Sequence, residues 1–103
     1  MIDARRVLRE RIYFSDGSFA DLVIWQVPQP LRGSRHNYEY RLALVVGNEC
    51  VLRYDNEPGK GDHKHVGHSE HRIEFTDLER LYADFALDAG RWVDWSSGRP
   101  GDE

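Results

Sequence analysis

Several features that would assign this sequence quickly to a class of protein are absent from it. Cys50 is the only cysteine, so no disulfide can form within the chain, and the apolar residues around it predict a buried thiol. No run approaches the roughly 18 apolar residues that a membrane-spanning helix needs. The start of the chain, MIDARRVLRE, is charged where a signal peptide would be apolar. These absences exclude a disulfide-stapled fold and predict a cytoplasmic protein that does not enter a membrane.

An excess of positive charge is also absent. The formal net charge is −4, which argues against indiscriminate binding of nucleic acids. Residues 1–73 carry 11 basic and 10 acidic side chains, whereas residues 74–103 carry 3 basic and 8 acidic ones. A polyanionic ligand would therefore meet the first part of the chain. A solvated acidic helix and tail explains the asymmetry equally well.

The hydrophobic pattern predicts a sheet built from two hairpins. Residues 6–14, 19–27, 38–46 and 49–54 are apolar or alternating runs that are typical of strands, and residues 71–75 are a candidate for a fifth strand. Asp16-Gly17 and Gly47-Asn48 are tight-turn signals, each lying between two of these runs. Antiparallel pairing is the most economical interpretation.

A helix is predicted after the last of these strands. Thr76 and Glu79 form a capping box, and Gly90 is a plausible C-cap. The apolar stripe that would face the sheet consists of Leu78, Leu81, Tyr82, Phe85 and Ala86. The prediction is therefore a single α+β domain, residues 1–95, in which one antiparallel sheet of four to five strands carries one C-terminal helix on one face. Residues 96–103 are predicted to be a flexible tail.

The stretch GKGDHKHVGHSEH, residues 59–71, contains four of the five histidines and both lysines. If the segment is extended, His63 and His65 project to the same side and could exchange protons across a phosphate, with Lys60 stabilising the developing charge. The same His-x-His spacing suits a metal ion, with His68 and His71 completing a set of four, although it matches no zinc signature. A solvated polar loop is the third interpretation.

Other residues are weaker candidates for binding a polyanion. His36 lies in a basic loop in which Arg35 and Arg41 could contact phosphate, but an ordinary surface loop explains these charges as well. Trp25 and Tyr40 could stack on bases, although aromatic residues in strands with this alternation are more often part of a core.

Two stretches resemble one known family. They are W-x-V-P-x-P-x-x-G-S-R-H-x-Y-x-Y-R-L, residues 25–42, and R-Y-D-N-E-x-G-K-G-D-H-K-H, residues 53–65. They are similar to the TumE family of small prokaryotic proteins, the toxin half of two-gene toxin–antitoxin modules, and the resemblance extends from about Arg9 to Phe85. It implies an action on RNA or translation and a small helix-turn-helix antitoxin as partner. The family motif falls on Tyr54, Asp55, Asn56, Gly59, Lys60, Gly61, Asp62, His63 and His65. His68 and His71 lie outside it, which weakens the four-histidine metal site.

The resulting hypothesis is a metal-independent ribonuclease toxin that needs no cofactor. The predicted catalytic residues are His63, His65, Lys60, Asp62 and Asp55, with one of the two aspartates orienting an imidazole. The predicted substrate-binding residues are Tyr54, Lys64, Arg41, Arg53 and His36. The expected partners are the antitoxin and RNA, with a homodimer left open. The alternatives are a non-catalytic module that binds protein or nucleic acid, and a metal-dependent enzyme of phosphoryl or nucleotidyl transfer.

Overall fold

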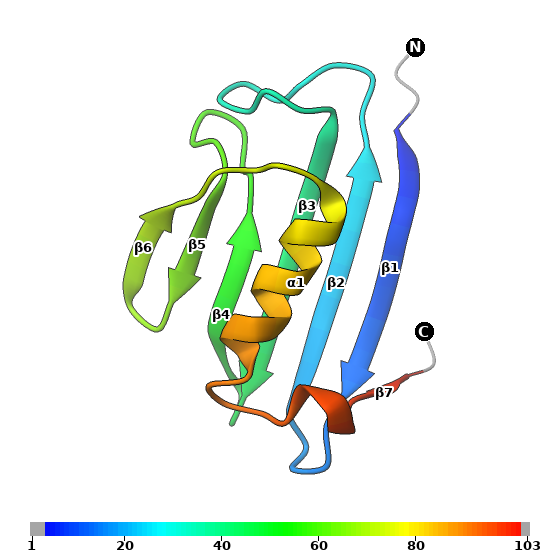
Figure 1. Cartoon of the computed structure of the whole chain (residues 1–103), viewed down its shortest axis with the longest axis vertical. Helices are drawn as coiled ribbons and strands as arrows, with labels where there is room; N and C mark the ends of the chain where they lie inside the picture. The colour runs from blue at the N-terminus through cyan, green and yellow to red at the C-terminus, as the bar shows by residue number, and fades with distance from the viewer. Residues whose placement is uncertain (1–3, 102–103) are drawn as a thin grey trace.

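The computed structural model describes residues 4–101, which form one antiparallel sheet with one α-helix across one of its faces (Figure 1). The strands are β1 (Arg5–Tyr13), β2 (Phe19–Gln26), β3 (Tyr38–Val46), β4 (Glu49–Asp55), β5 (His63–Val66), β6 (Ser69–Arg72) and β7 (Arg99–Pro100), and the helix α1 spans Leu78–Ala89. The strand order is β6-β5-β4-β3-β2-β1-β7, so successive hairpins lie side by side. The predicted α+β class and the antiparallel pairing are confirmed.

The first two hairpins follow from the turn chemistry of the sequence. In the β1–β2 turn, the Asp16 carboxylate accepts a hydrogen bond from the backbone N–H of Ser18 at 2.9 Å. In the β3–β4 turn, Gly47 and Asn48 both have positive φ angles, 57° and 66°. Glycine and asparagine tolerate this left-handed conformation, which matches the twist of a two-residue hairpin. These turns set the register of the four central strands.

The sheet has seven strands, so the predicted number of four to five is wrong. β5 and β6 form a third hairpin around the turn at Gly67 and His68. Their sequences, HKHV and SEHR, lack the apolar alternation that marks a strand, because β6 is an exposed edge strand and β5 is mainly polar. Of the predicted fifth strand, residues 71–75, only His71 and Arg72 belong to β6.

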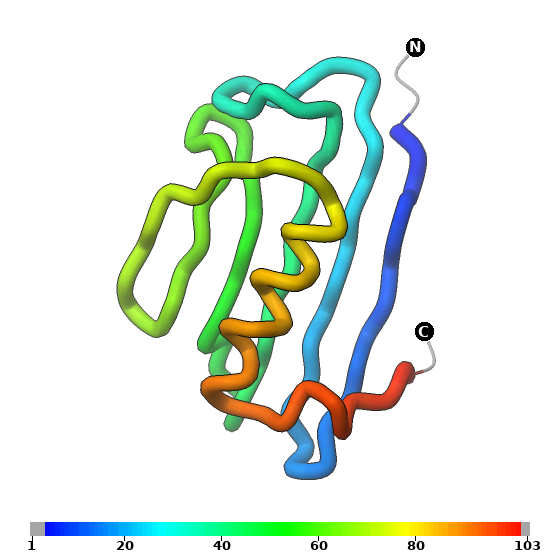
Figure 2. The backbone as a smooth tube through the Cα atoms, in the orientation of Figure 1, coloured from blue at the N-terminus to red at the C-terminus, as the bar shows by residue number. Residues whose placement is uncertain are grey.

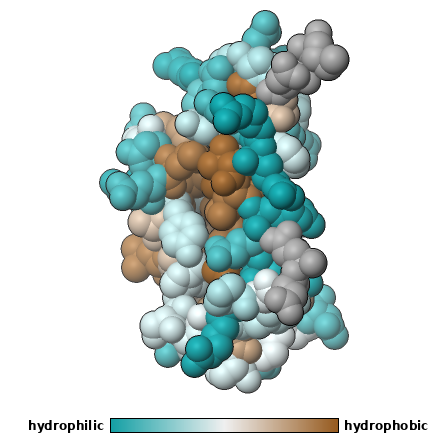
Figure 3. Space-filling model, turned by 90° about the vertical axis from the view of Figure 1, so that its right-hand side faces the viewer, coloured by the Kyte–Doolittle hydropathy of each residue, from teal (hydrophilic) through white to brown (hydrophobic). Residues whose placement is uncertain are grey.

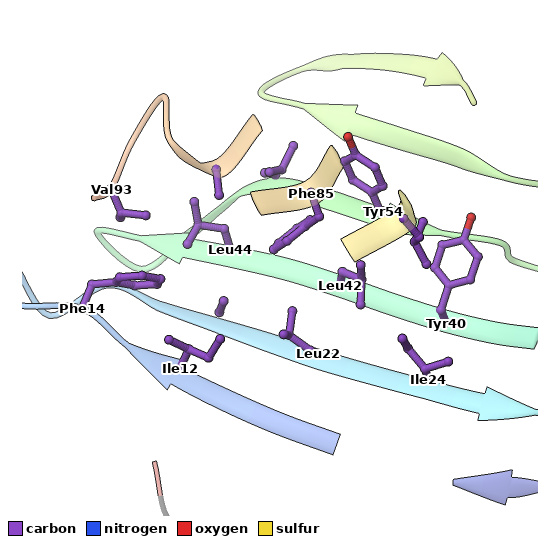
Figure 4. Packing of buried hydrophobic residues seen from close by; sticks show 14 residues of the cluster. Ile12, Phe14, Leu22, Ile24, Tyr40, Leu42, Leu44, Tyr54, Phe85 and Val93 are labelled. Atoms are coloured by element: carbon purple, nitrogen blue, oxygen red, sulfur yellow. The ribbon is translucent and has the colours of Figure 1, made fainter. Parts of the chain in front are cut away.

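The hydrophobic core lies between the helix and the face of the sheet that it covers. Leu22, Leu42, Leu44 and Leu52 come from neighbouring strands and are fully buried, and Phe85 of α1 packs among them (Figure 4). Each leucine alternates with residues that face the other side, as expected for strands with one buried face. This arrangement leaves the second face of the sheet free of the helix.

The helix begins later than the predicted capping box. Asp77 is the N-cap, and its carboxylate accepts a hydrogen bond from the Arg80 backbone N–H at 2.7 Å. Thr76 lies one residue before this cap, so the predicted capping box of Thr76 and Glu79 does not begin the helix. Gly90 caps the C-terminus, as predicted.

The region predicted as a flexible tail takes part in the sheet. Arg99 and Pro100 of β7 pair with Tyr13 and Ile12 of β1. They follow the 3-10 turn η1 (Trp95–Ser97), whose Trp95 ring lies 5.5 Å from that of Phe14, between ring centroids. This aromatic contact holds the segment against the core. Residues 102 and 103 of the predicted tail lie outside the described residues.

Two loops at one end of the sheet pack backbone against backbone. The loop before β3 and the loop before β5 lie side by side (Figure 2), and the Arg32 carbonyl accepts a hydrogen bond from the Gly59 N–H at 2.8 Å. Gly61 has a φ of +77°, and a Cβ there would lie 2.8 Å from the Gly33 carbonyl oxygen. Only glycine fits such an approach. The contact fixes the chain just before it enters β5 at His63.

The prediction that the thiol of Cys50 is buried is wrong. Cys50 is exposed, not buried, because it lies beside the β3–β4 turn, where the register shifts between Leu44 and Val45.

Seen from the β1 side, the molecule shows a hydrophobic area bordered by hydrophilic residues (Figure 3). Within residues 4–101, no helix is long and apolar enough to cross a membrane.

Candidate functional site

The polar residues of β4 and β5 gather on the sheet face that lacks the helix. Asp55 pairs in register with His63, and Arg53 pairs with His65, so all four side chains project to the same side. Alternation along a strand sends their neighbours to the helix-covered side. Lys60 and Glu70 join them, and we call these six residues, Arg53, Asp55, Lys60, His63, His65 and Glu70, the open-face cluster.

Asp55 is the centre of the cluster. Its Oδ2 lies 2.9 Å from Nε of Arg53, and its Oδ1 lies 2.9 Å from Nε2 of His63. Both distances are those of ion pairs, but neither contact has the alignment of a hydrogen bond. Among the described residues, Asp55 Oδ1 is thus a buried oxygen without a hydrogen-bond partner, and Arg53 Nε is a buried donor without one. Such atoms are rare in stable proteins, because their desolvation is not compensated.

His63 is fixed in one tautomer. Its side chain is only 5% exposed, and Nδ1 lies 2.9 Å from the carbonyl oxygen of Gly61. A carbonyl can only accept, so Nδ1 carries a proton and donates it. Nε2, which faces Asp55 and Glu70, then either presents a lone pair or carries the second proton of an imidazolium. This nitrogen is the one available for chemistry.

Glu70 reaches the cluster from β6. Its Oε2 lies 3.4 Å from Nε2 of His63, 3.6 Å from Nε2 of His65 and 3.5 Å from Nζ of Lys60. Burial alone would raise the pKa of Glu70, but the positive charges of Lys60, His65 and His63 lower it below the usual value. Burial and the nearby Arg53 lower the pKa of His65, which favours its neutral form.

The cluster has the composition of a metal site. The ligand atoms of Asp55, His63 and His65 all lie within 4.8 Å of one another. The imidazole rings of the two histidines lie 5.0 Å apart, between centroids, as expected for residues two apart on one strand. The same residues contain acids and bases that could transfer protons. Both kinds of chemistry therefore have the necessary groups here.

Two predicted substrate-binding residues lie elsewhere. Tyr54 and Lys64 face the helix, where the Tyr54 hydroxyl donates to Asp88 Oδ2 at 2.6 Å and Lys64 Nζ donates to the same oxygen at 2.9 Å. Because β5 is a strand and not a loop, Lys64 points away from His63 and His65. Arg41 does project to the open face, where it pairs in register with Asp55.

His36 and Asp62 form a separate pair under the loops. Nε2 of His36 lies 2.7 Å from Asp62 Oδ1, which also accepts a hydrogen bond from the Tyr40 hydroxyl at 2.7 Å. The Tyr38 backbone N–H donates to Nδ1 of His36 at 3.2 Å, and the Phe75 ring stacks on the imidazole at 3.8 Å between centroids. Asp62 thus orients the imidazole of His36, and not an imidazole of the His63–His65 pair, for which one of the two aspartates was predicted.

The family assignment rests on a comparison of the whole sequence. A family model described as Toxin TumE matches residues 2–93. The chain belongs to the TumE toxin family. The resemblance seen in the sequence is confirmed, and membership implies the toxin component of a toxin–antitoxin module with an antitoxin as partner. No curated protein and no solved structure matches the chain.

One cluster residue of this TumE-family toxin was not predicted from the sequence. Glu70 lies outside the family motif that the sequence displays, and a lone glutamate in a polar stretch carries no distinctive signal. Its position opposite His65 follows only from the β5–β6 register. His68 lies in the turn, and His71 pairs with Lys64 on the helix-covered side. Neither joins His63 and His65, so Asp55 and Glu70 complete the cluster in their place.

Proposed function

We propose that this toxin cleaves RNA on the open face of its sheet, with the open-face cluster as the catalytic centre. The observation that carries the proposal is the convergence of two imidazoles, two carboxylates and two cationic side chains on one surface. These are the groups that phosphoryl transfer uses to move protons and to stabilise negative charge. RNA brings its own nucleophile, the 2′-hydroxyl.

A transverse row of residues supports RNA as the substrate. Following the strand register across the sheet, Arg9, Val23, Arg41, Asp55, His63 and Arg72 lie side by side on the open face. Neighbouring strands are about 4.8 Å apart, so Arg41 and Arg72 flank the cluster within roughly 15 Å of each other. Arginines on the two sides of the cluster could hold phosphates of a single strand on either side of the bond that is cleaved.

An aromatic residue adjoins this row. Trp25 pairs in register with Glu39, two residues before Arg41 on β3, and therefore also projects to the open face. It is half-buried, which leaves part of the indole available. Stacking of a base on an aromatic ring beside a basic groove is the usual way in which single-stranded RNA is bound. The acidic helix α1 lies on the other face of the sheet, away from this surface.

The bond-breaking step can proceed by two routes that use the same residues. In the route that the sequence predicts, His63 and His65 act as base and acid without a metal. The low exposure of His63 and its bond to Gly61 favour a second route, in which the cluster acts through a bound cation. Cleavage of RNA by the purified protein in EDTA would support the first route, and loss of cleavage that an added divalent ion restores would support the second.

Substitution tests the proposed substrate site. We expect Arg41→Ala to raise KM for a single-stranded RNA roughly tenfold, with a weaker dependence on salt and little change in kcat. The matched control is Arg80→Ala on the exposed side of α1, where Arg80 pairs with Asp84. Equal effects of the two substitutions would contradict RNA binding on the open face.

The alternative is a non-catalytic module that binds a partner protein or nucleic acid through the same surface. His65→Ala separates the two functions. A ribonuclease would lose RNA cleavage and growth inhibition in this variant but still bind its antitoxin, proposed to be a helix-turn-helix protein. If no RNA is cleaved with any divalent ion and His65→Ala abolishes antitoxin binding, the binding module replaces the ribonuclease.

A further inference from the structure

We infer that the open-face cluster is a binding site for one divalent first-row transition-metal ion, held by Asp55, His63, His65 and Glu70. Oε2 of Glu70 lies 3.4 Å and 3.6 Å from the two imidazole Nε2 atoms. With metal–ligand bonds of about 2.0–2.1 Å, ligands at the corners of a tetrahedron are about 3.4 Å apart. Both distances from Glu70 match that spacing. Ligand atoms of Asp55, His63 and His65, one from each residue, lie within 4.8 Å of one another.

The hydrogen bonding of the cluster points independently to a missing cation. Asp55 Oδ1 and His65 Nε2 are both buried and have no hydrogen-bond partner among residues 4–101. Both atoms can donate a lone pair, and both belong to residues whose ligand atoms lie within 4.8 Å of one another. A cation bound by both atoms would supply the partner that neither finds as a hydrogen bond within the described residues.

The tautomer of His63 is the one that a metal ligand requires. A ligating imidazole usually donates its second ring N–H to a carbonyl or carboxylate, which fixes the orientation of the ring. His63 does so through Nδ1 to the Gly61 carbonyl at 2.9 Å, and its Nε2, the nitrogen that would bind the ion, faces Asp55 and Glu70. The close packing of Gly61 against Gly33 holds that carbonyl in place.

The ligand set selects the kind of ion. Two imidazoles with two carboxylates suit Zn²⁺, Ni²⁺ or Mn²⁺, whereas Mg²⁺ and Ca²⁺ prefer ligands that are all oxygen. The two carboxylates balance the charge of a divalent ion. Lys60, half-exposed and 3.5 Å from Glu70, is on a flexible side chain that can turn toward solvent when the ion binds.

The test measures metal binding directly, without RNA. The full chain, first treated with chelator and dialysed, is titrated with ZnCl₂, NiCl₂, MnCl₂ or MgCl₂ in a calorimeter, and its Tm is measured with each ion. We expect one Zn²⁺ or Ni²⁺ per chain, a rise in Tm of roughly 10 °C at saturating ion, and no comparable binding of Mg²⁺. Asp55→Asn and His65→Ala should each weaken binding at least about 100-fold.

His71→Ala is the matched control, because His71 lies on the same hairpin but projects to the helix-covered side. It should leave the affinity unchanged. The inference is overturned if the wild type binds none of these ions at one per chain, or if His71→Ala weakens binding as much as His65→Ala. The result is separable from the proposed function, since an ion bound without RNA cleavage removes only the ribonuclease, and cleavage in EDTA without metal binding removes only the metal site.

Discussion

Two histidine–aspartate pairs among residues 4–101 have similar N–O distances, 2.7 Å and 2.9 Å, but differ in their hydrogen bonding. In the His36–Asp62 pair, Nδ1 of His36 accepts a backbone hydrogen bond, so Nε2 carries the proton and donates it to the carboxylate at 2.7 Å. In the His63–Asp55 pair, Nδ1 donates to a backbone carbonyl, and Nε2 lies 2.9 Å from the carboxylate without the alignment of a hydrogen bond. We call His36–Asp62 the closed pair, because it is joined by a hydrogen bond. We call His63–Asp55 the open pair, because Asp55 Oδ1 has no hydrogen-bond partner among the described residues.

The difference separates a structural pair from a functional one. Asp62 accepts hydrogen bonds from both Tyr40 and His36, and Phe75 covers the imidazole. A further ligand would therefore gain little free energy by binding to this pair. Asp55 keeps a buried oxygen without a hydrogen-bond partner in the described part of the chain. Proteins tolerate such incompleteness mainly where a ligand or a reaction uses it. Both aspartates belong to the family motif, and the sequence alone gives them equal weight.

Removing the carboxylate of the closed pair should have the largest effect on stability. Asp62→Ala leaves the Tyr40 hydroxyl and Nε2–H of His36 without their acceptor in a mostly buried site. Each unsatisfied donor costs about 1–3 kcal/mol, so we expect the free energy of unfolding to fall by about 3 kcal/mol in urea denaturation. Asp62→Asn keeps an acceptor oxygen and should lose less. A loss below about 1 kcal/mol for Asp62→Ala would show that this pair is not structural.

Replacing the carboxylate of the open pair by an amide should be neutral or stabilising. In Asp55→Asn, the amide nitrogen can donate to the lone pair of His63 Nε2, while the amide oxygen stays toward Arg53. We therefore expect the free energy of unfolding in EDTA to equal that of the wild type or to rise by up to about 1 kcal/mol. With added Zn²⁺, the wild type should have the larger free energy of unfolding, since only the wild type would bind the ion. A fall of about 3 kcal/mol in EDTA would mean that Asp55 binds an imidazolium and that the two pairs are alike.

The contrast explains how much could be predicted from the sequence. The four central strands, their turns and the helix stripe follow from apolar periodicity, because burial on one face imposes it. The open sheet face with Arg53, Asp55, His63 and His65 follows from the same alternation. The β5–β6 hairpin does not, because its strands are mainly polar and lack the apolar alternation that marks a strand.

The positions of several site residues could not be predicted either, because they depend on contacts that only the folded chain makes. Lys64 and Asp62 lie beside His63 in sequence, but strand alternation turns Lys64 to the helix, and the loop turns Asp62 to Tyr40. Glu70 joins the cluster only through the register of β6, a strand that the sequence pattern does not predict. Which ring nitrogen carries the proton depends on Gly61 and Tyr38, whose backbone groups are brought to the two histidines by the fold.

The smallest effect is expected on the helix-covered face, where Asp88 binds Tyr54 and Lys64. Burial alone would raise the pKa of Asp88, but the hydrogen bonds from Tyr54 and Lys64 and the charges of Lys64 and Arg91 lower it below the usual value of an aspartate. A carboxyl group with a lowered pKa in the folded chain stabilises the protein above its unfolded pKa. That contribution is lost as the pH falls through the folded value. Asp88→Asn should therefore unfold more easily than the wild type at neutral pH, by less than about 1 kcal/mol for a partly exposed pair.

This difference should disappear in acid, so the stability of Asp88→Asn should decline less between about pH 4 and pH 2 than that of the wild type in urea denaturation. A constant difference across that range would contradict the lowered pKa of Asp88. The variant should also bind Zn²⁺ as the wild type does, because Tyr54 and Lys64 project to the face opposite Asp55 and His65. A weaker affinity for Zn²⁺ would show that the two faces of β4 and β5 are coupled. The open pair would then depend on the contacts of Asp88 with Tyr54 and Lys64 on the helix-covered face.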